Sequence, residues 1–135
     1  MLGYIVVMTV RNYFTIFAGL SVLFGIGFVL APGQVLSIYG VQGSPDVELV
    51  ARLYGGTLLS IAVIEWLARD LPEAAVQAVL IGLGIAGVIN LVVLAMATLA
   101  GTVNAMGWSA VLIYLGAAVG AGYFLTAGQS QQRAP

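Results

Sequence analysis

The stretch from Pro45 to Arg69, "PDVELVARLYGGTLLSIAVIEWLAR", gives the strongest indication of the fold. Its interior is almost entirely apolar, and its length suits a helix that needs roughly 20 residues to cross ~30 Å of hydrocarbon. Ser44 precedes a proline and the acids Asp46 and Glu48. This order is typical of a helix N-terminus, with an N-cap, a first-turn proline and negative charge near the positive end of the helix dipole. The stretch predicts one membrane-spanning helix.

The whole chain has the same character. It has 135 residues, of which 61% are hydrophobic and 7% charged, whereas soluble domains are about 25% charged. A small soluble domain could not bury that much apolar surface. We therefore expect a single all-α membrane domain over 1–135, a four-transmembrane-helix bundle with up-down topology. The expected helices cover about 13–31, 45–69, 72–100 and 105–127, with an outer loop at 32–44 and a polar tail at 128–135.

Helix boundaries follow from local signals. Asp70, Pro72 and Glu73 repeat the pattern of a capped helix start, while Pro32-Gly33 and Gly101 mark ends. A cleavable signal is a competing interpretation of residues 1–31, but their apolar run exceeds the usual 7–15 residues and favours a retained helix. Residues 1–10 either extend this helix or lie in the interface.

Arginine is the only basic residue type and predicts the orientation. With four spans, Arg11, Arg69 and Arg133 fall on the side of the two termini, and Arg52 alone falls on the other. The positive-inside rule then places both termini in the cytoplasm. We expect a multi-pass protein of the cell inner membrane.

The composition excludes several kinds of chemistry. There is no cysteine and no histidine, so thiolate, imidazole and the usual zinc or haem sites are absent. No acid follows Glu73, and Glu65 lies about 25 Å along the helix from Glu48. We expect no metal, no cofactor and no catalytic activity. Basic patches are also missing, which argues against a nucleic-acid partner.

Small residues predict close helix packing. "GLGIAG" at 82–87 matches a dinucleotide-binding motif, but it lies within an apolar segment and no acid follows it. Gly82 with Ala86, and Gly116 with Gly120, have the spacing that lets membrane helices approach closely.

Charged and aromatic residues near the segment ends suggest interfacial roles. Glu65 and Arg69 are one turn apart, so we expect an ion pair between them near the cytoplasmic end. Trp66 and Trp108 fall near opposite ends of their helices, where indole rings usually mark the interface.

Arg52 is the exception, because it lies about 10 Å beyond Pro45 along its helix. An intramembrane arginine is expected to face the bundle and to have a partner, and Glu48 is one turn earlier. Similar depth adds further residues to an expected polar cluster, either structural or ligand-binding, in the outer half of the bundle. Its members are Glu48, Arg52, Tyr54, Gly55, Gly56, Asn90 and Tyr114.

"ELVARLYGG" at 48–56 resembles the Glu-x-x-x-Arg-x-Tyr-Gly-Gly signature of a family of small bacterial four-helix membrane proteins of uncharacterised function. That family is loosely similar to DoxX-like membrane proteins. The resemblance implies a four-helix bundle in a bacterial inner membrane and brings no established activity with it.

Three functional hypotheses remain open, and the least favoured is an enzyme in which Glu48 and Tyr114 transfer a proton. The first is a non-catalytic structural or accessory subunit, forming a homo-oligomer or joining a larger membrane complex, in which Glu48 and Arg52 act as an internal staple. The second is a binder or carrier of a small lipophilic or anionic ligand, quinone-like or lipid-like, with Arg52 as counter-ion.

Overall fold

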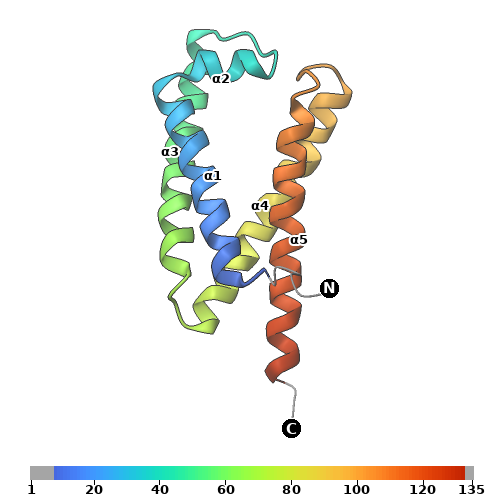
Figure 1. Ribbon diagram of the computed structural model, residues 1–135. Coiled ribbons are helices and arrows are strands. Elements are labelled where there is room, and N and C mark those ends of the chain that lie inside the picture. Colours follow the sequence, from blue (N-terminus) through green and yellow to red (C-terminus); the bar gives the residue numbers. More distant parts are fainter. Residues whose placement is uncertain (1–7, 133–135) are drawn as a thin grey trace, which may run out of the picture.

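The computed structural model describes residues 8–132, which form five α-helices and no β-strand (Figure 1). The helices are α1 (Val10–Leu30), α2 (Pro32–Ile38), α3 (Pro45–Ala68), α4 (Glu73–Leu99) and α5 (Gly107–Gln132). All except α2 are long and apolar enough to cross a membrane. The described chain is therefore an all-helical protein with the length and composition of a multi-pass membrane protein.

The four long helices form two pairs. α1 packs along α3, and α4 packs along α5, whereas contact between the α1/α3 pair and the α4/α5 pair is much more limited. The two pairs meet at the lower end in Figure 1 and separate towards the upper end, where α2 lies. The start of α1, the end of α5 and the α3–α4 turn all lie towards the lower end.

Glycines allow the close approach within each pair. A Cβ atom at Gly55 of α3 would lie 2.9 Å from the carbonyl oxygen of Gly25 in α1. A Cβ atom at Gly87 of α4 would lie 3.0 Å from the backbone nitrogen of Ala118 in α5. Such backbone proximity is how membrane helices gain van der Waals contact, since lipid supplies no hydrophobic force between them.

The two pairs are joined at the lower end by a small buried core. Its members are Tyr13, Phe14, Ala68, Leu80 and Ala121, one or two from each long helix. The Tyr13 hydroxyl donates a hydrogen bond of 2.7 Å to the carbonyl oxygen of Ala117 in α5. This bond satisfies a buried hydroxyl and ties α1 to α5.

Several helix ends differ from those predicted. α1 begins at Val10, where Thr9 caps it by accepting a hydrogen bond from Asn12 N, and residues 1–7 lie outside the described part. The expected outer loop contains α2, because Pro32 starts a new helix after ending the previous one. α5 runs to Gln132, through residues assigned to the polar tail. Ser44 and Gly101 mark a helix start and a helix end as predicted, Gly101 with φ +75°.

Asp70 does not cap α4 as predicted. The N-cap of α4 is Pro72, and no side chain caps it. Asp70 instead accepts a hydrogen bond of 2.6 Å from Arg11, in an exposed ion pair that links the ends of α1 and α3. Arg133, which contributed to the predicted orientation, lies outside the described residues.

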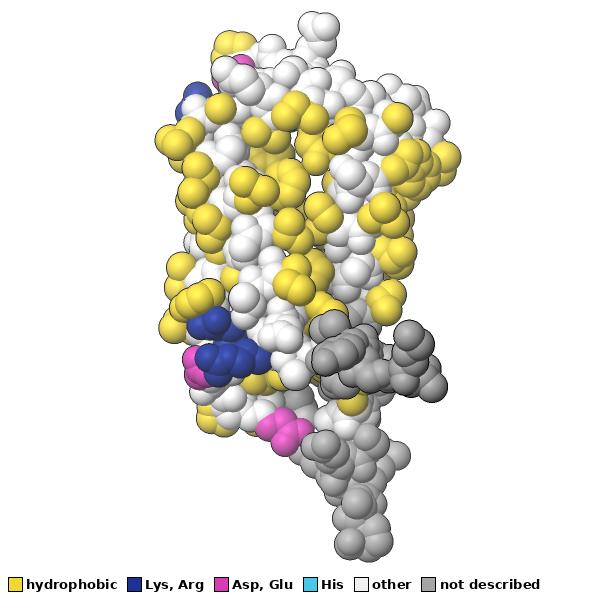
Figure 2. Space-filling view, viewed as in Figure 1, with side chains coloured by type: hydrophobic (Ala, Val, Ile, Leu, Met, Phe, Trp, Pro, Cys, Tyr) yellow, Lys and Arg dark blue, Asp and Glu magenta, His cyan; other side chains and the backbone are white. Residues whose placement is uncertain are grey.

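The outer surface matches a lipid environment. Large exposed apolar side chains cover the outward faces of the long helices, among them Leu23, Leu53, Ile85 and Leu112. In Figure 2 the visible charged side chains lie towards the two ends of the molecule, and hydrophobic ones cover much of the surface between.

Candidate ligand-binding cavity

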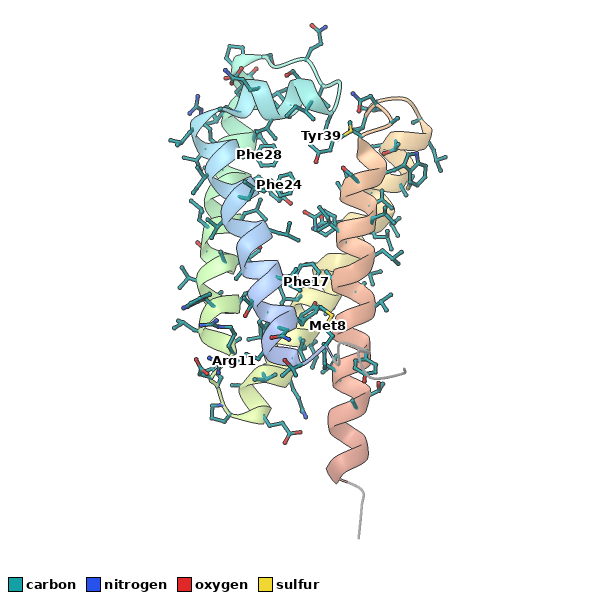
Figure 3. All side chains as sticks on the ribbon, viewed as in Figure 1. Met8, Arg11, Phe17, Phe24, Phe28 and Tyr39 are labelled. Atoms are coloured by element: carbon teal, nitrogen blue, oxygen red, sulfur yellow. The ribbon has the colours of Figure 1, made fainter. Side chains whose placement is uncertain are left out.

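A cavity of about 390 Å³ lies between the α1/α3 pair and the α4/α5 pair. Its wall is largely apolar and includes six aromatic rings, those of Phe17, Phe24, Phe28, Tyr39, Tyr54 and Tyr114. Phe24 and Phe28 extend from α1, and Tyr39 from the C-terminal end of α2, into the space between the pairs (Figure 3). The hollow is visible in the upper half of Figure 2, between hydrophobic side chains.

The two ends of the cavity are closed by contacts between the helix pairs. At the lower end lies the buried core, where the Tyr13 ring of α1 packs against the Phe124 ring of α5 with centroids 5.6 Å apart. At the upper end, Asn104 in the α4–α5 connection donates hydrogen bonds to the carbonyl oxygens of Ile38 (3.0 Å) and Tyr39 (2.9 Å). The cavity thus lies between a packed core below and the Asn104 hydrogen bonds above.

A hydrogen bond between two cavity-lining tyrosines also joins the helix pairs. The hydroxyl groups of Tyr54 in α3 and Tyr114 in α5 are bonded to each other. The Tyr54 ring also packs edge-to-face on Phe28, with centroids 5.5 Å apart. Both tyrosines were predicted members of the polar cluster, and the structure brings them together on the cavity wall.

Among the described residues that line the cavity, Glu65 is the one with an ionisable acidic or basic group other than tyrosine. Its side chain is only 2% exposed, and its Oε2 accepts a hydrogen bond of 2.9 Å from the Ser21 hydroxyl of α1. A carboxyl group in the interior of a membrane protein is costly and marks a functional site by default. It is the most informative polar group that the structure adds to the site.

The predicted Glu65–Arg69 ion pair is not formed. The Arg69 guanidinium instead lies 3.3 Å from the centroid of the Trp66 ring and donates a hydrogen bond to the Trp66 carbonyl. Glu65 turns inward because it continues a stripe of α3 that faces the cavity. The stripe consists of Tyr54, Leu58, Ile61 and Glu65, at spacings of four, three and four residues. That helical periodicity is readable in the sequence and would have indicated the inward position of Glu65.

Asn90 of α4 also lies on the cavity wall, as does Ala86 one turn earlier. Among the described residues, none forms a hydrogen bond with the Asn90 amide. An amide has two donors and an acceptor, so this side chain is available to a polar group within the cavity.

Arg52 lies outside the cavity. Its side chain is exposed, and its Nη1 donates a hydrogen bond of 2.6 Å to the carbonyl oxygen of Val29. Val29 is in the last turn of α1, where carbonyl groups lack helical partners and where the helix dipole favours a positive charge. Arg52 therefore caps α1 from the neighbouring helix, and the prediction that it faces the bundle near Asn90 is wrong.

The predicted ion pair between Arg52 and Glu48 is also absent. Arg11–Asp70 is the single ion pair within 4.0 Å among the described residues. The Glu48 side chain is directed towards residues that precede α3. A Cβ atom added at Gly33 would lie 2.8 Å from Glu48 Oε1, and one added at Gly43 would lie 2.9 Å from it. Its carboxylate occupies the space that these two glycines leave.

The glycines named from the sequence differ in how closely other helices approach them. Gly55 faces α1, and Gly120 faces the Tyr13 ring of α1, so both lie at helix contacts. Gly116 approaches Phe17 at 3.7 Å, an ordinary contact. At Gly56 and Gly82, a Cβ atom would meet no described neighbour within 4 Å. Within α4 the close approach occurs at Gly87, which the sequence analysis did not single out.

Comparison with protein-family models, with curated proteins and with solved structures finds no match to this chain. The resemblance to the small four-helix membrane family thus stays a prediction.

Proposed function

We propose that this chain is an integral membrane protein that binds a small lipophilic molecule with a polar group in the cavity between its helix pairs. In this proposal both termini lie in the cytoplasm and the membrane is the bacterial inner membrane. The α3–α4 turn, with Arg11 and Arg69 nearby, then lies on the cytoplasmic side, in accord with the positive-inside rule.

The observation that supports this function is the coincidence of volume and lining. A space of about 390 Å³ falls within the range of roughly 300–1,000 Å³ that ligand pockets occupy. Such pockets are mostly apolar with a few placed polar groups, and here these are Glu65, Asn90 and the Tyr54–Tyr114 pair. A bundle that served only as a scaffold would gain stability by filling this space, because unfilled volume costs packing contacts.

The position of Arg52 changes the expected chemistry of the ligand. The binder hypothesis gives Arg52 the role of counter-ion for an anionic or polar head group, but its guanidinium is bound to the end of α1, away from the cavity. The proposed function therefore depends on the cavity wall and not on Arg52.

The experiment compares two matched alanine replacements in α4. Ala86 lines the cavity, whereas Ala78 is exposed on the outer surface of the same helix. The chain is purified in native-lipid discs. Small molecules are then extracted from the purified sample and measured by mass spectrometry. Unmodified chain and Ala78→Phe should retain the same lipophilic molecule, and Ala86→Phe should lose it, because a phenyl ring fills the cavity.

Two results would contradict the proposal. Equal retention by all three proteins would place the molecule outside the cavity. If no small molecule is retained and none of a panel of added lipophiles raises the melting temperature, the other hypothesis, a non-catalytic accessory or structural subunit, would be favoured.

A further inference from the structure

We infer that the cavity selects a lipophilic cation, of the organic ammonium type, whose positive charge lies against the Glu65 carboxyl group. This inference rests on the proposed function, since it specifies the ligand class of the same cavity. It follows from the balance of charge around Glu65, the hydrogen bonds that Glu65 makes, and the aromatic lining.

The charges around Glu65 favour a cationic ligand. The chain has no histidine, and its four basic residues are all arginines. None of the described residues lining the cavity is an arginine. Arg11 pairs with Asp70, Arg52 caps α1, and Arg69 stacks on Trp66. Each of these three contacts lies away from the cavity wall, so no described residue supplies Glu65 with a positive partner.

The hydrogen bonding of Glu65 leaves room for a ligand group. Ser21 donates one hydrogen bond to Oε2, and among the described residues no other donor reaches the carboxyl group. A carboxylate has about four acceptor positions. Oε1 is thus left for a group that enters the cavity.

Burial gives an unpaired charge on Glu65 a high free energy. An isolated charge transferred from water to an apolar interior is strongly unfavourable unless it is paired and hydrogen-bonded. A cationic ligand would supply the missing charge, whereas an anionic one would place two like charges in the same apolar space. The neighbourhood of Glu65 therefore discriminates by the sign of the ligand's charge.

The aromatic lining of the cavity is also compatible with a cation. Six aromatic rings face the cavity, from α1, from the end of α2, from α3 and from α5. Aromatic faces attract ammonium groups within about 6 Å of the ring centroid, and rings arranged around a space are how proteins recognise quaternary ammonium ions. Tyr54 lies 11 residues, about 16 Å, from Glu65 along α3, so the rings at its end of the cavity line the space for apolar substituents of a cation whose charge lies at Glu65.

The test uses two probes of one shape. Benzyltrimethylammonium is a permanent cation, and neopentylbenzene is its neutral isostere, with carbon in place of nitrogen. Binding of each to the full chain in a neutral detergent is measured by titration calorimetry and by the change in melting temperature. The unmodified chain should bind the cation at least about tenfold more tightly than the hydrocarbon, because the hydrocarbon lacks the charge pair.

Three variants complete the design. Glu65→Gln should weaken binding of the cation at least about tenfold and leave that of the hydrocarbon unchanged. Glu65→Asp, which retains the charge, should keep the preference for the cation. Glu48→Gln removes an acid of the same helix that lies outside the cavity, and it should bind both probes as the unmodified chain does.

The outcomes separate this inference from the proposed function. Equal affinity of the unmodified chain for both probes, or unchanged affinity of Glu65→Gln for the cation, would overturn the cation assignment. If Ala86→Phe still abolished binding of the hydrocarbon, the cavity would remain the ligand site, now for neutral molecules. If Ala86→Phe bound both probes normally, the proposed function itself would fail. The comparison of probes on the unmodified chain decides the charge preference even if Glu65→Gln does not fold.

Discussion

Tyr54 of α3 and Tyr114 of α5 share a hydrogen bond between their hydroxyl groups, across the space that separates the two helix pairs. It lies at the level of the cavity, between the buried core below and the Asn104 contacts above, and gives the two pairs a polar contact there. Because the bond joins elements 60 residues apart in sequence, it reports on the assembled bundle and not on either pair alone.

Replacing either tyrosine by phenylalanine should therefore weaken the assembled bundle. We expect Tyr54→Phe and Tyr114→Phe each to lower the free energy of unfolding by about 0.5–1.5 kcal/mol, the usual net value of one hydrogen bond. The double variant should lose little more than either single one, since both remove the same bond. Unfolding in mixed detergent gives the coupling energy, and Tyr123→Phe, which changes an exposed ring, is the control. Additive losses would show that the two hydroxyls act separately.

Arg52 should contribute to stability as a cap of α1. Arg52→Ala is expected to cost about 1 kcal/mol, because the Val29 carbonyl loses a charged donor near the negative end of the helix. A combined Arg52→Ala and Glu48→Gln variant should show the sum of the single effects, since the two side chains form no ion pair. Recovery of stability in the double variant, measured by thermal unfolding, would instead reveal a pair between them.

The adjacent glycines 55 and 56 should respond in opposite ways to alanine. At Gly55 a Cβ atom would approach Phe28 Cβ to 2.8 Å and the backbone nitrogen of Val29 to 2.9 Å, so Gly55→Ala should separate α3 from α1 and destabilise the protein. At Gly56 no described atom lies within 4 Å of such a Cβ, and Gly56→Ala should stabilise by up to about 1 kcal/mol through helix propensity. Melting temperatures of the two variants test this, and equal shifts would contradict the observed packing.

A second glycine contrast concerns α4 and α5. Gly120 of α5 faces the Tyr13 ring, so Gly120→Leu should displace that ring from the buried core and lower the melting temperature in detergent. A Cβ atom at Gly82 of α4 would meet no described neighbour within 4 Å, so Gly82→Leu serves as the control. An unchanged melting curve for Gly120→Leu would mean that this face of α5 points to lipid.

The proposed orientation can be tested with single cysteines, because the chain contains none of its own. Gln42, before α3, and Ala74, in the first turn of α4, are both exposed and lie at opposite ends of the bundle. In intact cells, an impermeant thiol reagent should label Gln42→Cys and not Ala74→Cys. The reverse pattern would place the termini outside the cell.

The number of helices long and apolar enough to span a membrane was predictable because bilayer thickness and composition constrain it directly, and the start of α3 followed from Ser44 and Pro45. The members of the polar cluster were harder to predict, since depth along the axis does not indicate the direction of a side chain. Arg52 and Tyr54 lie at nearly equal depth, yet at about 100° per residue they point in almost opposite directions. Tyr54 faces the cavity, so Arg52 cannot.

Glu65 was misplaced for a related reason. Its spacing from Arg69 is compatible with a local ion pair, whereas the inward position follows only from the longer stripe that joins Glu65 to Tyr54. The cavity itself could not be predicted, because it arises from the limited contact between two pairs that are each closely packed. Single-helix periodicity carries no information about how far apart two such pairs stand.

The position of the cavity also determines whether its occupancy depends on the ligand concentration in the membrane or on that in water. In the proposed setting it lies at the depth of the acyl chains, so a lipophile reaches it after partitioning into the bilayer. The stabilisation by ligand then depends on molecules of ligand per molecule of lipid, and not on its concentration in water. Dilution of the sample with buffer should leave occupancy almost constant, whereas addition of empty lipid vesicles should deplete it.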